Sequence, residues 1–304
     1  MHKKILLAGG TGLIGSHLVN ELLNRGDEVT LVSRDAGSAK NKFKKKVNAV
    51  NWDEVYTLKN ESINAVVNLS GMNLDDKRWN DKVKREIYDS RVGTTGKLVD
   101  FISKMNHRPE VLINSSGVDI YGEKGDEDIY EDSKPGNGFL PQLVTDWEKE
   151  ALKAEYYNIR VVIFRTGFVV ARESKGLKKM ALPFKFFVGG PPGSGNQYMS
   201  WIHIDDLVRL YLLAIDNPDI NGIIHAVSPN PETMKDFTKH LAEVIHRPSL
   251  FPIPEFVIRT LFGDVADVIV RGRKALPGKL EKLGYTFKYS NAKDALKEAL
   301  GKKS

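Results

Sequence analysis

The sequence predicts an α/β fold, in which a doubly wound parallel sheet is followed by a small C-terminal lobe. Three observations lead to this prediction: a glycine-rich turn follows a short apolar run at residues 5–8, strand and helix patterns alternate up to about residue 165, and the alternation loosens past Gly167. Strands that alternate with helices form parallel sheets through right-handed crossovers. We expect the sheet domain to span residues 1–228, with cleft-forming insertions from about residue 168, and a helical lobe to span residues 229–304.

The turn after the first strand has the spacing of a phosphate-binding loop. Gly9, Gly12 and Gly15 lie three residues apart, and Gly10, Gly12 and Gly15 also fit G-x-G-x-x-G. One glycine permits the turn, one lets a pyrophosphate approach the backbone, and one lets helix and strand pack closely. The sequence therefore predicts a Rossmann-type site in which the phosphates contact Gly9, Gly10, Thr11, Gly12, Leu13, Ile14 and Gly15. The alternative is a glycine turn in another α/β unit that binds nothing.

The second strand, at residues 28–33, indicates which dinucleotide this site prefers. NAD-binding folds usually place Asp or Glu at the end of this strand, where it accepts hydrogen bonds from the ribose hydroxyls. Here Ser33 and Arg34 occupy that end, and Asp35 comes one residue too late. A serine hydroxyl and a guanidinium can both bind a 2′-phosphate, so we expect NADP rather than NAD. In the alternative interpretation Arg34 is a solvated loop residue.

The ends of later strands predict further contacts with the dinucleotide. Strands are expected at residues 47–52, 65–70, 111–116, 159–165 and 222–227. Such folds usually hold the adenine near the end of the third strand, and small residues after the fourth let the backbone pass beneath the cofactor. The additional cofactor contacts that we expect are Trp52, Leu69, Ser70, Gly71, Arg91 and Ser115.

Helix patterns fill the connections between these strands. Polar helical residues run from about 79 to 90, a second helix reaches about residue 104, and a third spans about 140–156. A later apolar helix follows W-I-H-I-D-D at residues 201–206, and Asp205 or Asp206 is expected to cap it. The lysines at positions 40, 42, 44, 45 and 46 are expected to form a solvated face with a mildly attractive field for an anionic cofactor.

Composition limits the classes of protein that the chain can represent. Its 304 residues include no cysteine, and the net charge is +6. The seven histidines lack zinc-site spacing, no apolar run approaches the length of a membrane span, and the N-terminus runs directly into the first strand. We therefore expect a cytoplasmic protein with a small-molecule substrate and without a metal site, a membrane span or a nucleic-acid partner.

Several motifs together resemble a known superfamily. The glycine turn, the pair Ser115 and Ser116 ahead of Tyr121-Gly122, and residues 201–206 resemble the extended short-chain dehydrogenase/reductases, which include sugar-nucleotide epimerases and dehydratases. S-R-V-G-T at 90–94, D-W-E at 146–148, G-G-P at 189–191, S-W-I-H at 200–203 and the ending at 273–287 are similar to the atypical YfcH-like "epimerase family protein" subgroup. The resemblance covers essentially the whole chain. It implies a Rossmann fold, a dinucleotide and a substrate cleft beside the C-terminal lobe.

The resemblance also implies a catalytic set that this chain lacks in part. In the superfamily a Ser and the Tyr and Lys of Y-x-x-x-K transfer the proton while hydride passes to nicotinamide. Ser116 matches the serine, whereas Gln142 stands where the tyrosine is expected and Asp146 four residues later, where the lysine is expected. The subgroup shares this departure. Asp146 is therefore the leading alternative acid/base and Tyr121 the second, although either residue can instead have a purely structural role.

These observations leave two classes of function open. The first is an NADP-dependent oxidoreductase or epimerase with a non-standard active site and an unidentified substrate. The second is a catalytically silent NADP-binding protein with a regulatory or interaction role. A remnant that binds neither cofactor nor substrate is a third reading, against which the intact glycine turn argues. By analogy with relatives that dimerise through two helices, the chain is expected to be a monomer or a homodimer.

Overall fold

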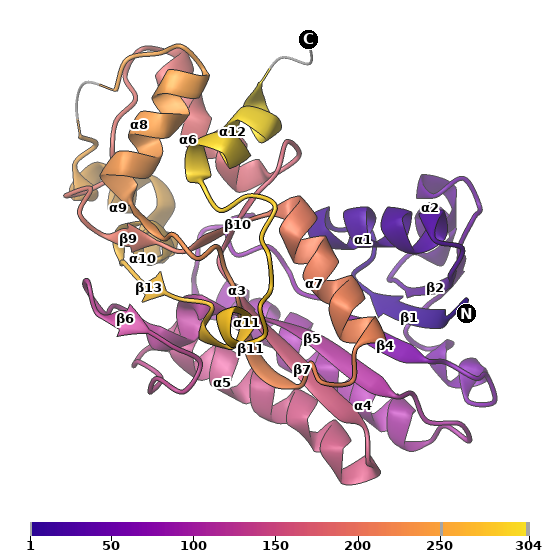
Figure 1. Ribbon diagram of the computed structural model, residues 1–304. Helices are drawn as coiled ribbons and strands as arrows, with labels where there is room; N and C mark the ends of the chain where they lie inside the picture. The colour runs from indigo at the N-terminus through magenta and orange to yellow at the C-terminus, as the bar shows by residue number, and fades with distance from the viewer. Residues whose placement is uncertain (1, 250–251, 302–304) are drawn as a thin grey trace.

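The computed structural model describes residues 2–249 and 252–301. Seven of the strands in this part of the chain form one parallel sheet (Figure 1). Its order is β11 (Gly222–Ala226), β7 (Arg160–Thr166), β5 (Val111–Gly117), β4 (Ala65–Asn68), β1 (Lys4–Ala8), β2 (Glu28–Val32) and β3 (Asn48–Val50). The strand order reverses at β1, where β2 pairs on one side and β4 on the other. A crevice at such a reversal is where ligands bind in open α/β sheets.

Helices cover both faces of the sheet. The buried residues on one face come from α1 (Leu13–Asn24), α2 (Ala36–Lys42), α7 (Ile204–Asp216) and α11 (Gly278–Lys282). Those on the other face come from η1 (Val55–Leu58), α4 (Thr94–Ser103), α5 (Phe139–Leu152) and η4 (Lys153–Tyr157). α3 (Asp81–Tyr88) packs against α5, and the π-turn η2 (Asp89–Gly93) leads from α3 into α4. This arrangement confirms the predicted α/β fold with a parallel sheet.

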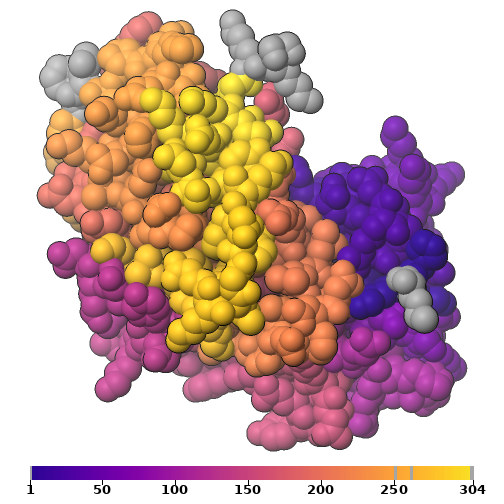
Figure 2. Space-filling model, in the orientation of Figure 1, coloured from indigo at the N-terminus to yellow at the C-terminus, as the bar shows by residue number. Residues whose placement is uncertain are grey.

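A second part of the chain lies above the carboxyl ends of the strands (Figures 1 and 2). Its helices are α6 (Lys175–Lys185), α8 (Met234–Val244), α9 (Glu255–Phe262), α10 (Ala266–Val270) and α12 (Ala292–Leu300), with η5 (Gly263–Val265) between α9 and α10. Short strands support it: β8 (Phe168–Val170) pairs with β10 (Trp201–His203), and β9 (Tyr198–Met199) pairs with β12 (Glu232–Thr233). The buried side chains therefore form two separate clusters. One lies between the sheet and the helices α1 and α7, and the other lies in this lobe.

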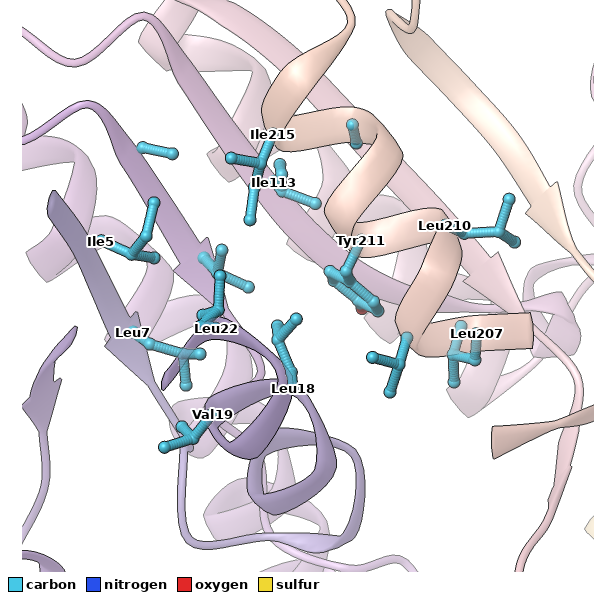
Figure 3. Packing of buried hydrophobic residues seen from close by; sticks show 14 of the residues in the cluster. Ile5, Leu7, Leu18, Val19, Leu22, Ile113, Leu207, Leu210, Tyr211 and Ile215 are labelled. Atoms are coloured by element: carbon cyan, nitrogen blue, oxygen red, sulfur yellow. The ribbon is translucent and has the colours of Figure 1, made fainter. Parts of the chain in front are cut away.

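The packing of α1 and α7 on the sheet fixes the glycine turn in place. Leu18, Val19 and Leu22 of α1 are fully buried, and Figure 3 shows Leu18 facing Tyr211 of α7 and Leu22 beside Leu7 of β1. Burying each aliphatic side chain of this kind stabilises the fold by roughly 1.5–3 kcal/mol. The buried apolar face of this helix therefore holds its N-terminus at the end of β1.

The C-terminal segment returns from the lobe to the sheet domain. β13 (Lys274–Ala275) pairs in parallel with β6 (Asp128–Ile129), which lies in the loop after η3 (Val118–Tyr121). Further along, the fully buried carboxylate of Asp206 on α7 accepts hydrogen bonds from the backbone N–H groups of Lys288 (2.7 Å) and Tyr289 (2.9 Å). In Figure 2 this segment, coloured yellow, runs across both parts of the molecule.

Local structure differs from the sequence prediction at a few element ends. The cap of α7 is neither Asp205 nor Asp206, because the side chain of His203 accepts the hydrogen bond from the N–H of Asp205 (3.2 Å). α3 begins only at Asp81, since Asn80 caps it through the N–H of Val83 (2.9 Å). The third strand is shorter than expected and ends at Val50. Within the described residues no helix is both long and apolar enough to span a membrane.

Candidate functional site

The glycine turn between β1 and α1 is built by close backbone contacts. A Cβ atom on Gly9, whose φ is 80°, would lie 2.4 Å from the carbonyl oxygen of Leu69. A Cβ atom on Gly15 would lie 2.4 Å from the carbonyl oxygen of Gly9. Both positions therefore require glycine for packing. Gly12 differs, because its φ of −72° suits any residue and a Cβ atom there would meet only the oxygen of Gly9, at 3.3 Å.

The open side of Gly12 coincides with the N-terminus of α1. Gly12 is the N-cap residue and makes no side-chain capping bond. The first N–H groups of a helix have no partner within the helix, and they attract anions. Thr11, Gly12 and Leu13 all line a cleft at this point. The residues of the turn therefore fit a diphosphate that approaches the backbone at Gly12.

The charged groups beside this turn favour an anion. Arg34 after β2 is exposed, and the hydroxyl of Ser33 accepts a hydrogen bond from the N–H of Asp35 (3.3 Å). Asp35 itself caps α2, where its carboxylate accepts hydrogen bonds from the N–H and the hydroxyl of Ser38. These bonds lower the pKa of Asp35 and keep its carboxylate at the N-terminus of α2. Lys42 reaches back from α2 and donates to the carbonyl oxygen of Thr11 (2.7 Å), so one of the predicted surface lysines lines the cleft.

The cleft runs from the glycine turn to the lobe and has a volume of about 1400 Å³. Its lining comes from α1, from the loops after β4, β5 and β7, from α6 and from residues 253–273. Typical pockets for one drug-sized ligand occupy roughly 300–1,000 Å³. The cleft is therefore large enough for a dinucleotide together with a second molecule.

Arg91, Asp119 and Arg273 are among the charged residues that line this cleft beyond the glycine turn. Nη2 of Arg273 pairs with Oδ1 of Asp119 at 3.2 Å, and both residues line the cleft. Arg91 lines it too, packs over the ring of Trp147 at 5.5 Å and donates a long bond to the carbonyl oxygen of Ile87 (3.4 Å). Burial lowers the pKa of Arg91 to about 10, although the charge of Asp119 opposes this shift. Arg91 is therefore still a cation at neutral pH.

Below the cleft, Ser116 belongs to a buried polar network. Successive residues of a strand face opposite sides of the sheet, so Ser115 and Ser116 point to different helices. The Ser116 hydroxyl donates to Oε1 of Glu148 on α5 (2.6 Å), and that carboxylate forms a two-pronged ion pair with Arg165 of β7, at 2.8 Å and 2.7 Å. All three residues are buried. The network ties β5, β7 and α5 together.

Tyr121 extends this network towards β11. Its fully buried hydroxyl accepts a hydrogen bond from Nη1 of Arg165 (2.5 Å) and donates to Nε2 of His225 (2.6 Å). Nδ1 of His225 carries the ring proton, because it lies 2.8 Å from the carbonyl oxygen of Leu276, which can only accept. Burial raises the pKa of Tyr121 to about 12, although the charge of Arg165 opposes this, and burial lowers the pKa of His225. Both groups are therefore neutral at pH 7.

Gln142 and Asp146 lie together on α5. Nε2 of Gln142 donates to Oδ1 of Asp146 (3.0 Å), and the hydroxyl of Tyr88 on α3 lies 3.4 Å from Oδ2 of Asp146. Burial and the nearby charge of Asp146 raise the pKa of Tyr88. Tyr88 packs in the same cluster as Leu74 and Val268, both of which line the cleft. A protonated phenol thus stands beside the helical turn where the superfamily carries Y-x-x-x-K.

A family model decides how this arrangement is classified. The model of the "NAD dependent epimerase/dehydratase family" matches residues 5–226, and a model described as a "domain of unknown function (DUF1731)" matches residues 253–299. The chain belongs to the NAD-dependent epimerase/dehydratase family. The resemblance seen in the sequence is thereby confirmed, and the C-terminal match fits the small lobe of the YfcH-like subgroup.

Relatives of this epimerase family chain match over nearly its full length. An epimerase family protein of Staphylococcus haemolyticus is 40% identical over 98% of this chain and 99% of its own. A chloroplastic epimerase family protein of Arabidopsis thaliana, the SDR39U1 homolog, is 37% identical over 96% of this chain and 85% of its own. The crystal structure of human epimerase family protein SDR39U1 with NADPH has a TM-score of 0.88 and 33% identity, and covers 97% of this chain and 98% of its own.

The epimerase family chain brings most of its predicted cofactor residues to the carboxyl edge of the sheet. Thr11, Gly12, Leu13 and Arg91 line the cleft itself. The other predicted residues do not line the cleft. They lie at the ends of β1, β2, β4 and β5, in the first turn of α1, or in the turn after β3. These residues are Gly9, Gly10, Ile14, Gly15, Ser33, Arg34, Trp52, Leu69, Ser70, Gly71 and Ser115. Their contacts with a cofactor remain predictions.

The predicted catalytic residues divide into two groups. Ser116 and Tyr121 hold their hydroxyls in the buried network, and Gln142 and Asp146 bond to each other on α5, so none of the four lines the cleft. Neither the cleft residues Asp119 and Arg273 nor the neighbouring Tyr88 was predicted as a site residue. Asp119 was detectable as a polar residue just past β5, whereas Arg273 is far from it in sequence. Among the described residues no group of three His, Asp or Glu side chains is placed to hold a metal ion.

Proposed function

We propose that this chain binds NADPH in the cleft and transfers hydride between it and a small carbonyl or alcohol substrate, as a reductase or as an epimerase. The observation that carries the proposal is the open N-terminus of α1 at Gly12, with Arg34 and Lys42 beside it and Asp35 engaged as the cap of α2. The relative of known structure that was crystallised with NADPH supports the same cofactor.

Each residue near the turn has a proposed role. The N–H groups of Leu13 and Ile14 bind the diphosphate, and Gly12 leaves room for it. Ser33 and Arg34 bind the 2′-phosphate, since a guanidinium holds a phosphate through two charge-assisted hydrogen bonds. Lys42 adds a further positive charge. The nicotinamide half then extends over β4 and β5 towards Arg91 and Asp119, because a dinucleotide spans the point where the strand order reverses.

Tyr88 and Asp146 are proposed to handle the proton. Bound NADPH supplies a hydride to the carbonyl carbon, and the resulting alkoxide needs one proton from the protein or from water. The hydroxyl of Tyr88 is protonated at neutral pH and donates a long hydrogen bond (3.4 Å) to the carboxylate of Asp146, which orients it. Tyr88 would give its proton to the alkoxide, and the resulting phenolate would take a proton from water. This pair would replace the missing Tyr and Lys with groups from two helices, α3 and α5.

Cofactor choice tests the proposal most directly. In titration calorimetry of the full chain, NADPH is expected to bind more tightly than NADH. Arg34→Glu is expected to weaken NADPH binding about 10- to 100-fold, because hydrogen bonds to charged groups contribute roughly 1.5–3 kcal/mol. NADH binding should change little. Arg108→Glu, on the exposed side of the protein away from the cleft, serves as the matched control. Failure of both nucleotides to bind below about millimolar concentration would refute the proposal.

Turnover tests the proton-transfer pair. With NADPH and a panel of carbonyl compounds, Tyr88→Phe and Asp146→Asn are each expected to lower the rate of NADPH oxidation by about 10²-fold or more. NADPH affinity should stay within a few-fold. Asp81→Asn changes an exposed acid at the other end of the helix that carries Tyr88 and should leave the rate unchanged. If both variants oxidise NADPH at the rate of the parent chain, Tyr88 and Asp146 do not transfer the proton.

A second candidate is a catalytically silent NADPH-binding protein. One observation favours it: the hydroxyls of Ser116 and Tyr121, which occupy the segment where relatives keep their reactive serine, are fixed in the buried network. Tight NADPH binding together with no oxidation across a broad carbonyl panel would favour this candidate.

A further inference from the structure

The wall of the cleft opposite the glycine turn is apolar. It is formed by side chains of the segment that contains α9, η5 and α10 and by α6, among them Ile253, Ile258, Val265, Val268 and Met180. None of these side chains carries a hydrogen-bonding group. A ligand rich in hydroxyl groups would lose its hydrogen bonds to water here without replacement, which is unfavourable. This wall therefore suits a ligand with an extended apolar body.

The floor of the cleft next to this wall contains a buried arginine, Arg273, with one nitrogen atom that has no hydrogen-bond partner among the described residues. The side chain of Arg273 is 7% exposed, and its Nη2 pairs with Asp119. Its Nε is buried and has no hydrogen-bond partner among the described residues. Native proteins seldom leave a buried N–H unpaired, so such a group calls for an explanation such as a missing ligand.

The other charged residues of the cleft lining have partners of their own and do not balance the positive charges of Arg91 and Arg273. Arg271 pairs with Asp267 (3.1 Å), Lys179 pairs with Asp75 (2.7 Å), and Lys175 pairs with Asp76 (3.2 Å). Glu173, the remaining acid of the lining, lies 3.2 Å from His17 beside α1. Beyond the glycine turn, Arg91 and Arg273 thus face the single carboxylate of Asp119, and one positive charge remains for a ligand.

From this juxtaposition we infer that the second occupant of the cleft is an amphipathic carboxylic acid, with one carboxylate and a long apolar body. The carboxylate binds Arg273 and Arg91, and the body lies along Ile258 and Val268. A nucleotide sugar, with two phosphates and many hydroxyls, fits neither the single excess charge nor the wall. As a statement about the substrate this inference rests on the proposed function, but binding of the acid does not require NADPH.

Four probes separate the two parts of such a ligand. In calorimetry with the full chain, sodium octanoate is expected to bind at least tenfold more tightly than sodium acetate, which lacks the apolar body, and than 1-octanol, which lacks the charge. UDP-glucose, the fourth probe, is expected to bind more weakly than octanoate. Tighter binding of UDP-glucose, or equal binding of octanoate and octanol, would overturn the inference.

Two pairs of variants locate the site. Val268→Asp on the wall and Arg273→Gln on the floor are each expected to weaken octanoate binding at least tenfold. Their controls are Phe256→Asp, which changes a 71% exposed apolar residue on α9, and Arg108→Gln, which changes an exposed arginine outside the cleft lining. The controls should keep octanoate affinity within twofold. If neither Val268→Asp nor Arg273→Gln changes the affinity for octanoate, the acid binds elsewhere and the inference is wrong.

NADPH titration of the same variants keeps the two proposals apart. Val268→Asp and the two controls should bind NADPH within twofold of the parent chain. Arg273 pairs with Asp119, which lies where we place the nicotinamide, so no such limit is set for Arg273→Gln. Circular dichroism shows that all four variants are folded. If octanoate binds with the expected pattern and NADPH does not bind, the cofactor proposal fails and the acid site stands. If NADPH binds and octanoate does not, the acid site fails and the cofactor proposal stands.

Discussion

Replacing Glu148 with alanine is expected to lower the free energy of unfolding by about 3–5 kcal/mol. The carboxylate accepts hydrogen bonds from Ser116 and from two nitrogen atoms of Arg165, and all three residues are buried. Its removal leaves the guanidinium of Arg165 charged in a site where water cannot solvate it, and leaves the Ser116 hydroxyl without its acceptor. Urea unfolding followed by circular dichroism measures the change.

Glu150, two residues along the same helix, provides the control. It pairs with Lys153 at 2.6 Å near the surface, and such pairs contribute about 0–1 kcal/mol, so Glu150→Ala should change the stability by no more than that. The double variant Glu148→Leu with Arg165→Met removes both charges together and is expected to regain much of the loss. A Glu148→Ala protein as stable as the Glu150→Ala protein would show that the network does not stabilise the sheet.

Replacing Gly12 with aspartate is expected to weaken NADPH binding on the order of 100-fold while leaving the protein folded. Gly12 is the N-cap of α1 and has extended backbone angles, and aspartate is among the residues that N-cap positions prefer. The new carboxylate would bind the free N–H groups of α1 and occupy the space that we assign to the diphosphate. The Cβ atom of the new residue would lie 3.3 Å from the carbonyl oxygen of Gly9, a tight contact, so the melting temperature should fall by no more than about a few degrees while calorimetry shows the loss of affinity.

Two further glycine variants make this result specific. Gly93→Asp adds the same charge at an exposed position with no atom within 4 Å, and NADPH binding should not change. Gly15→Ala, in the same turn as Gly12, should instead destabilise the fold, because its Cβ atom would lie 2.4 Å from the carbonyl oxygen of Gly9. If Gly12→Asp kept NADPH affinity within threefold of the parent chain, the phosphates would not lie at this turn.

The sheet and the glycine turn were predictable because their signals are local. An apolar run such as residues 5–8 that is followed at once by a glycine turn indicates a buried strand, and the four-residue spacing of Leu18 and Leu22 indicates the face of α1 that meets the sheet. Element ends were less predictable, since caps depend on single side chains. His203 caps α7 although two aspartates follow it, because Asp206 is engaged by the backbone at Lys288, 82 residues away.

The second half of the candidate site depends on contacts between distant parts of the chain. Arg273 meets Asp119, and Tyr88 meets Asp146, across 154 and 58 positions of sequence. No spacing rule relates such residues. The same limit applies to Ser116 and Tyr121, whose positions matched the superfamily pattern. That their hydroxyls bond to Glu148 and His225 depends on how α5 and β11 pack against β5.

The return of the C-terminal segment to the sheet domain bears on how this family evolves. The stretch matched by the domain of unknown function supplies β13 to the loop that holds β6, α11 to the sheet face, and the N–H groups that solvate Asp206. Without this stretch the buried carboxylate of Asp206 would lose both backbone donors and keep only a 3.4 Å contact with Arg209. Asp206 and the residues that fold positions 288–289 against it are therefore expected to change together as relatives diverge.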